Sequence, residues 1–227
     1  MKKYFIYILF FSLILVNFAS SHVSHYKKIK LLKYELFLNN KLIGTHIFHF
    51  RQKNELFYVN SKGSFKVNKL GVVIIDFETQ TEEVYKNDKL ISFKSDTNQN
   101  NKKKFAKVNS KNEKTFIIDG SSFKGETDKS ALIGTWWNHE IIKISKQISP
   151  ISGRVNNQKV KFLGKENILI DGTEFNALHF HFLSDDDKPD DKKKINIHVW
   201  YDSKTLLWIK SKYNKFGEWE YRLSEVR

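Results

Sequence analysis

The sequence contains no cysteine, only two prolines and one methionine in 227 residues. Without cysteine the chain can form no disulfide, carry no lipid on an N-terminal cysteine and build no thiolate metal site. The folded part must therefore be held together by its apolar core, which is adequate at this length. The scarcity of proline leaves long stretches free to pair as β-strands.

Long hydrophobic runs are also scarce, and the main one lies at the N-terminus. Lys2 and Lys3 precede an apolar run over residues 4–19, and small residues follow it at 19–21. This order is typical of a secretory signal peptide, and the run is shorter than the roughly 20 residues of a membrane-spanning helix. We therefore predict a signal peptide at 1–21, a single β-rich domain at 22–227, and a periplasmic or secreted location. A retained N-terminal anchor is the alternative.

The charge balance is strongly basic. The formal net charge is +14, and it falls to +12 when Lys2 and Lys3 leave with the signal peptide. A field of this sign favours anionic partners such as lipid headgroups, so contact with a membrane surface is expected from the charge. Nucleic-acid recognition motifs are absent, and we expect no nucleic-acid partner. Lysines dispersed over solvated strand faces and loops are the simpler interpretation of the same excess.

Apolar and polar residues alternate through most of the chain. Tyr34, Leu36 and Leu38 share one strand face, and Asn39-Asn40 supplies a turn before the next strand. Strand-like segments at short spacing are separated by such turns. They cover residues 34–38, 42–51, 55–67, 72–85, 90–96, 105–108, 115–118, 159–162, 166–170, 175–182, 195–201, 206–213 and 219–226. This pattern predicts a mainly β fold with one strongly curved antiparallel sheet, a half-barrel or open barrel.

The segment 126–148 breaks the two-residue period. Leu132, Trp136 and Trp137 recur at helical intervals, and a second apolar group ends before Pro150. We therefore predict one or two short helices covering the concave side of the sheet. Adjacent residues on a helix point about 100° apart, so His139 and Glu140 do not form a natural acid–base pair. No complete catalytic constellation is visible in this segment.

Several short motifs recur in a characteristic order along the chain. They are Leu42-Ile43-Gly44-Thr45, residues 65–71 (FKVNKLG), Trp137-Asn138, residues 160–166 (VKFLGKE), and Val199-Trp200-Tyr201 followed by Leu207. In this order the chain resembles a family of exported bacterial proteins of unknown function. More remotely, it resembles the curved half-barrel sheets of periplasmic lipoprotein carriers. The resemblance implies a fold and a compartment, and it implies no activity.

The aromatic residues supply the candidate ligand site. Most of them should fill the core of a curved sheet, but strands that are apolar on both faces can also line a groove for an acyl chain or a glycan. The candidate ligand-binding residues are Trp136, Trp137, Trp200 and Trp208. We expect a non-enzymatic envelope protein that binds or carries an apolar or amphiphilic ligand, such as a lipid, without a cofactor.

Two alternatives remain open. His179 and His181 lie two apart on one strand face, and His198 is expected on the neighbouring strand. Three such imidazoles could bind zinc or copper in a metal-dependent hydrolase, whereas an ordinary half-buried strand explains the same spacing. The second alternative is a structural role as the partner of another envelope protein.

Overall fold

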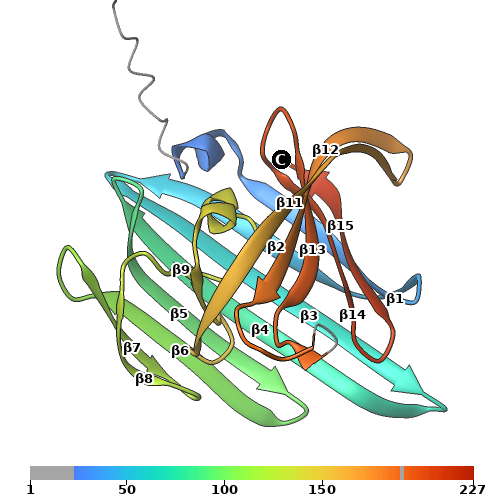
Figure 1. The fold of residues 1–227 in the computed structure, drawn as a ribbon, viewed down its shortest axis with the longest axis horizontal. Helices are drawn as coiled ribbons and strands as arrows, with labels where there is room; N and C mark the ends of the chain where they lie inside the picture. Colours follow the sequence, from blue (N-terminus) through green and yellow to red (C-terminus); the bar gives the residue numbers. More distant parts are fainter. Residues whose placement is uncertain (1–22, 190–191) are drawn as a thin grey trace, which may run out of the picture.

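The computed structural model describes residues 23–189 and 192–227, so the predicted signal peptide lies outside the described residues. The regular secondary structure of the described chain is almost entirely β-strand (Figure 1). Its first half contains η1 (Ser24–Lys28), β1 (Leu31–Leu38), β2 (Lys41–Lys53), β3 (Leu56–Lys69), β4 (Val72–Lys86), β5 (Lys89–Gln99), β6 (Lys102–Ser110), β7 (Thr115–Gly120) and β8 (Lys124–Asp128). Its second half contains β9 (Leu132–Ile133), η2 (His139–Lys143), β10 (Lys146–Ile148), β11 (Val155–Ile170), β12 (Thr173–Ser184), β13 (Asn196–Asp202), β14 (Trp208–Asn214) and β15 (Glu218–Val226).

These strands form one large open sheet in the order β8-β7-β6-β5-β4-β3-β2-β1-β15-β14-β13-β12-β11-β10-β9. Most neighbours in the sheet are also neighbours in the sequence, and the pairing of β1 with β15 joins the two halves. Every pair is antiparallel except β9 with β10. The prediction of a mainly β protein built on one sheet is confirmed.

Two-residue turns set the register of the long hairpins. Asn39-Asn40, Asn87-Asp88 and Asn100-Asn101 each have positive φ at both residues. Asn and Asp tolerate this left-handed conformation better than most residues, and such turns match the twist of the flanking strands. The hairpins β1–β2, β4–β5 and β5–β6 therefore share one turn chemistry, which was readable in the sequence.

The connection between the two edge strands explains why the sheet is curved. β8 ends at Asp128 and β9 begins at Leu132, although they stand at opposite ends of the strand order. Four residue steps span at most about 14 Å, so the two edges of the sheet must approach each other there. β8 and β9 do not pair, and the sheet stays open.

The connecting segment corrects one prediction. Residues 129–151, here called the plug segment, contain the short strands β9 and β10 at the edge of the sheet, and the chain between them lies against the concave side of the sheet (Figure 1) without an α-helix. In the described chain the helical pieces are two 3-10 turns, η1 and η2. The stretch 134–138 (GTWWN) consists of weak helix formers, and Asn138 is extended at φ −85°, ψ 99°. Neither 3-10 turn is long and apolar enough to cross a membrane.

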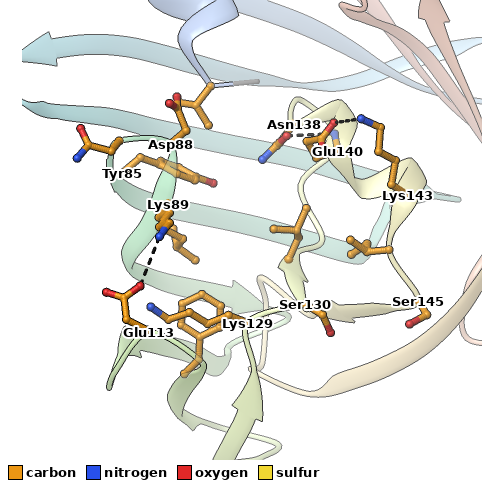
Figure 2. A pocket seen from close by; sticks show the side chains of 16 residues that line it. Tyr85, Asp88, Lys89, Glu113, Lys129, Ser130, Asn138, Glu140, Lys143 and Ser145 are labelled. Atoms are coloured by element: carbon orange, nitrogen blue, oxygen red, sulfur yellow. Dashed lines mark hydrogen bonds and ion pairs between the residues drawn. The ribbon is translucent and has the colours of Figure 1, made fainter. Parts of the chain in front are cut away.

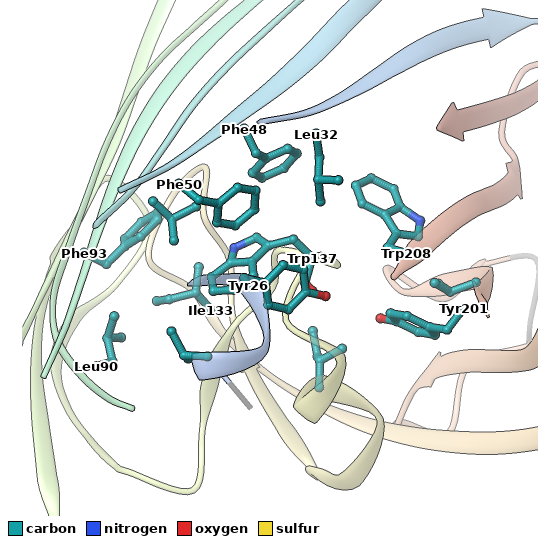
Figure 3. Close-up of a cluster of buried hydrophobic side chains, with 14 of the residues drawn as sticks. Tyr26, Leu32, Phe48, Phe50, Leu90, Phe93, Ile133, Trp137, Tyr201 and Trp208 are labelled. Carbon is teal, nitrogen blue, oxygen red and sulfur yellow. The ribbon is translucent and has the colours of Figure 1, made fainter. Parts of the chain in front are cut away.

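Trp137 lies at the centre of the core. Its side chain is fully buried and makes edge-to-face contacts with Tyr26 of η1 and Tyr85 of β4, at centroid distances of 5.1 and 5.8 Å. Phe50 of β2 completes the surrounding wall. The Tyr26 hydroxyl donates to the backbone carbonyl of Trp137. Figure 3 shows this indole between side chains from the two halves of the sheet, so the plug segment is part of the core.

Candidate functional site

A buried carboxylate on the sheet anchors the first half of the plug segment. Glu83 Oε1 accepts hydrogen bonds from Thr135 Oγ1 at 3.1 Å and from Trp137 Nε1 at 2.8 Å, and Oε2 accepts one from the Tyr85 hydroxyl at 2.5 Å. Desolvation raises the pKa of Glu83, and the three hydrogen bonds oppose that rise. Glu83 therefore fixes the orientation of the chain around Trp136.

A buried amide anchors the second half. Gln158 of β11 donates from Nε2 to the backbone carbonyls of Ile141 and Ile144, each at 3.1 Å. Its Oε1 accepts from Gln147 Nε2 at 2.7 Å. These bonds satisfy carbonyl groups at the end of η2 that have no partner within the turn. The plug segment is thus tied to both halves of the sheet.

A cavity of about 230 Å³ lies between the plug segment and the concave side; we call it the inner cavity. The sheet supplies aromatic and aliphatic walls, which are Leu36, Phe48, Phe65, Phe77, Trp208 and Tyr221. The plug segment supplies Gly134, Thr135, Trp136, Pro150 and Ile151. Trp208 is held there by stacking on Tyr34 at 4.0 Å, and the Tyr34 hydroxyl donates to the Trp208 carbonyl.

One wall of the inner cavity carries uncharged polar groups. His46 Nε2 lies 3.1 Å from Ser61 Oγ, and Ser61 Oγ lies 2.8 Å from Thr81 Oγ1. Thr79 also faces the cavity and bonds to Thr97. Desolvation lowers the pKa of His46 to about 4, so its ring is neutral at pH 7. This wall can exchange hydrogen bonds with an uncharged ligand group.

The contact between His46 and Ser61 resembles part of a nucleophile–base pair. An activated serine needs a base of suitable pKa that a third group orients. No carboxylate in residues 23–189 or 192–227 bonds to the His46 ring, and its lowered pKa makes it a weak base. The arrangement suits binding better than acyl transfer.

A second hollow of about 590 Å³ lies on the other side of the plug segment, and Figure 2 shows it. We call it the outer groove. Its floor is apolar, with Leu90, Phe116 and Leu132 among its lining residues. Its lysines have partners. Lys89 pairs with Glu113 at 3.4 Å and Lys143 with Glu140 at 2.8 Å. Lys129 lies 5.3 Å from the centroid of the Phe116 ring. The groove is therefore closely balanced in charge.

The four candidate tryptophans separate into three environments. Trp136 and Trp208 meet at the inner cavity, whereas Trp137 belongs to the core beside it. Trp200 lies on the opposite side of the sheet from Tyr201, whose hydroxyl bonds to the plug segment. Its indole stacks on His179 at 4.2 Å and donates to Glu166. Two of the four predicted residues are thus brought together at one cavity.

The three candidate histidines also come together, on that opposite side of the sheet. His179 Nε2 lies 2.8 Å from His198 Nδ1, and the rings of His181 and His198 stack nearly parallel at 4.2 Å. His179 Nδ1 lies 2.9 Å from Glu166 Oε1, and His181 Nε2 lies 2.8 Å from an Asn196 oxygen.

Desolvation lowers the pKa of His179 below its ordinary value. Desolvation, followed by the repulsion of the neighbouring histidines, lowers the pKa of His198 to about 4. Within the described residues, no group of three or more His, Asp or Glu side chains is arranged to hold a metal ion. Cross-strand neighbours project side by side, so their rings stack and their free nitrogens do not converge.

Sequence reasoning connected neither Glu83 with the plug segment nor His46 with the inner cavity. Glu83 follows Thr79 and Thr81 on the strand face that turns inward, so a carboxylate at a core position was visible in the alternation. His46 shares a face with Phe48 and Phe50, which are both buried. Neither position carries a recognisable motif, because Thr135 and Trp137, which bind Glu83, and Ser61, which contacts His46, are not adjacent to them in the sequence.

The fold has a counterpart among solved structures. The crystal structure of a beta-barrel-like protein of domain of unknown function DUF1849, from Brucella abortus, is similar with a TM-score of 0.63. The identity is 12%, and the match covers 87% of this chain and 96% of that chain. This likeness concerns the fold alone. A DUF1329 family protein from Desulfovibrio piger ATCC 29098 matches at 10% identity over 90% of this chain and 88% of that one, but its TM-score of 0.27 supports no argument. No curated protein matches the chain.

A family described only as a domain of unknown function matches most of the sequence. Its sequence model covers residues 34–224, which includes most of the sheet and the whole plug segment. The predicted resemblance to a family of unknown function with a curved-sheet fold is confirmed. The chain belongs to the family of domain of unknown function DUF6134.

Proposed function

We propose that the protein is an exported binding or carrier protein that holds one apolar tail or ring of an amphiphile in the inner cavity. The observation that carries this proposal is the aromatic lining of a cavity of about 230 Å³, one wall of which is supplied by the plug segment. An apolar cavity of about 150 Å³ already holds a benzene-sized molecule, and drug-sized ligands occupy about 300–1,000 Å³. The inner cavity therefore suits a single ring or a short alkyl segment.

The polarity of the wall narrows the ligand chemistry. Ser61, Thr79 and neutral His46 offer hydrogen bonds without charge. A charged headgroup inside this cavity would lose its hydration without an ionic partner, which is unfavourable. The buried part of the ligand is therefore uncharged, and an anionic headgroup would remain outside it.

A direct test begins with protein purified without detergent. Mass spectrometry of the solvent extract should identify a bound amphiphile, and titration with decanoate should raise the thermal midpoint and change the tryptophan fluorescence of Trp136 and Trp208. A protein that carries no amphiphile, and whose thermal midpoint does not respond to decanoate or a neutral alkyl glycoside, would exclude the carrier role.

A blocking variant locates the site. Ile151 is half-buried at the edge of the inner cavity, so Ile151→Trp should occlude it and weaken decanoate binding about tenfold or more. Ile117→Trp, at a position 42% exposed on β7, is the matched control and should bind normally. Lys129→Ala tests the outer groove, which Lys129 lines. If this variant alone lost affinity for decanoate, the ligand site would be the outer groove and not the inner cavity.

Two alternatives have their own tests. For a metal-dependent hydrolase, metal analysis should give stoichiometric zinc or copper that is lost in the His179→Ala/His181→Ala variant; sub-stoichiometric metal in both proteins removes this alternative. For a structural envelope partner, affinity capture should recover one stable protein and no small ligand. The export that all these roles assume is checked by cell fractionation and by N-terminal sequencing of the mature protein.

A further inference from the structure

The β3–β4 hairpin extends beyond both of its neighbours. β3 pairs with β2 only as far as Gly44–Phe65, and β4 pairs with β5 only as far as Phe77–Gln99. From Lys66–Asp76 onward the two strands pair with each other, and only the β5–β6 turn residue Asn100 still bonds to this part of β4. Figure 1 shows the hairpin, in cyan, protruding at one end of the sheet.

The tip of this ribbon is apolar and exposed. Leu70 is 95% exposed, and the following residues Val72, Val73 and Ile74 are 64%, 49% and 46% exposed. A protruding hairpin tip normally carries polar turn residues, and a cluster of exposed apolar side chains marks an interaction site. The described chain buries none of these four side chains.

Other hairpin tips at the same end share this character. The alternating strand directions place the β1–β2, β5–β6 and β14–β15 turns at the end where the β3–β4 turn lies. Leu42 beside the first of these turns is 51% exposed, and Phe216 in the last is 97% exposed. Exposed lysines accompany them, namely Lys41, Lys69, Lys102, Lys103 and Lys215.

The acidic groups at this end are largely matched. Asp76 pairs with Lys66 at 3.0 Å and Glu218 with Lys212 at 2.7 Å. In the β12–β13 connection, Asp185 pairs with Lys159 and Asp186 with Lys193. The lysines beside the apolar tips therefore leave a local positive charge.

We infer that this end of the sheet docks on an anionic lipid bilayer, with the β3–β4 tip inserted into the headgroup region. Apolar side chains flanked by lysines bind such surfaces through burial of hydrophobic area together with attraction to anionic headgroups. The apolar residues stand on separate hairpin tips, whereas a stable protein partner would need one continuous packed surface. Phe65 and Phe77, at the base of the ribbon, also line the inner cavity, so docking turns one end of that cavity towards the lipid.

The absence of native cysteine allows a site-specific test. Leu70→Cys and Leu169→Cys, each labelled with an environment-sensitive fluorophore, place the probe on two exposed leucines at opposite ends of the sheet. When phosphatidylglycerol–phosphatidylcholine vesicles are added, we expect the fluorescence emission of the probe at position 70 to shift to shorter wavelength. The emission of the probe at position 169 should not shift. The shift at position 70 should be weak with phosphatidylcholine alone and should fall as salt is raised.

Vesicle co-sedimentation of unlabelled protein completes the test. Leu70→Asp should reduce binding about tenfold or more, whereas Leu169→Asp should leave it unchanged. Both positions are exposed, so neither change should unfold the protein. A silent probe at position 70, an equal response at both positions, or unchanged binding by Leu70→Asp would overturn the inference. The Ile151→Trp variant should still bind vesicles, because docking does not depend on an occupied cavity.

Discussion

The hydrogen bonds of Glu83 should contribute a large share of the stability of this sheet. Glu83→Leu places an apolar side chain at a fully buried position and removes the acceptor for Thr135, Trp137 and Tyr85. A buried donor left without a partner costs about 1–3 kcal/mol, so three of them cost about 3–9 kcal/mol. Removing the carboxylate also relieves the desolvation that raises the Glu83 pKa, so we expect a net loss of about 2–4 kcal/mol.

Urea unfolding at pH 7, followed by far-UV circular dichroism, measures this loss. Glu82→Leu is the matched control, because Glu82 is the preceding residue of β4 and points to solvent. Surface substitutions of this kind change stability by about 0.5 kcal/mol or less. If Glu83→Leu fell within that margin of Glu82→Leu, the three hydrogen bonds could not be what anchors the plug segment.

The pH dependence of the unfolding free energy of the wild type and of Glu83→Gln checks the cause. Burial raises the Glu83 pKa above its ordinary value of 4.5, so at pH values between the two pKa values the native state holds a proton that the unfolded chain has lost. The contribution of this group is fully present below pH 4.5 and is lost as the pH rises through the folded pKa. Glu83→Gln, which keeps an acceptor oxygen, should remove this decline. Parallel stability curves for Glu83→Gln and the wild type would contradict the shift.

Three further predictions concern other buried contacts. Gln158→Leu should lower the free energy of unfolding by about 2–4 kcal/mol in urea titrations, because two carbonyls of the plug segment lose their donor. Gly44→Ala should lower the free energy of unfolding by about 3 kcal/mol or more in the same titrations. A Cβ at this position would collide with the Ser64 carbonyl oxygen and lie 2.6 Å from Phe65 Cα. His46 should remain neutral in NMR titrations down to about pH 4, and its contribution to stability should be lost as the pH falls from 6.5 towards 4. His46→Phe should flatten that part of the stability curve.

Local patterns predicted the strands better than they predicted the connecting segment. The alternation of Tyr34, Leu36 and Leu38 and the turn at Asn39-Asn40 define a hairpin without reference to the rest of the chain. The plug segment has no such local rule. Its conformation follows from hydrogen bonds to Glu83, which lies 54 positions before Trp137, and to Gln158, which lies 17 positions after Ile141. These bonds override the helical spacing of its apolar residues.

The candidate site could also be predicted only in part from the sequence. Trp136 and Trp208 could be nominated from their residue type, but their meeting at one cavity depends on the pairing of β14 with β15 and on the path of the plug segment. Trp137 has the same local signals as Trp136 and is a core residue. The difference between them is the indole N–H of Trp137, which finds a buried carboxylate 54 positions earlier in the chain.

The position of the plug segment couples stability to ligand binding. It fills the space where the two sheet edges approach each other, and it supplies one wall of the inner cavity. A ligand that binds only when the plug segment is in place stabilises that arrangement by RT ln(1 + [L]/Kd). A variant that loosens the plug segment must therefore lower the affinity for the ligand by the same coupling free energy. The Glu83 anchor, although it does not line the cavity, therefore belongs to the binding machinery. A ligand whose affinity is unchanged in Glu83→Leu would have to bind outside the inner cavity.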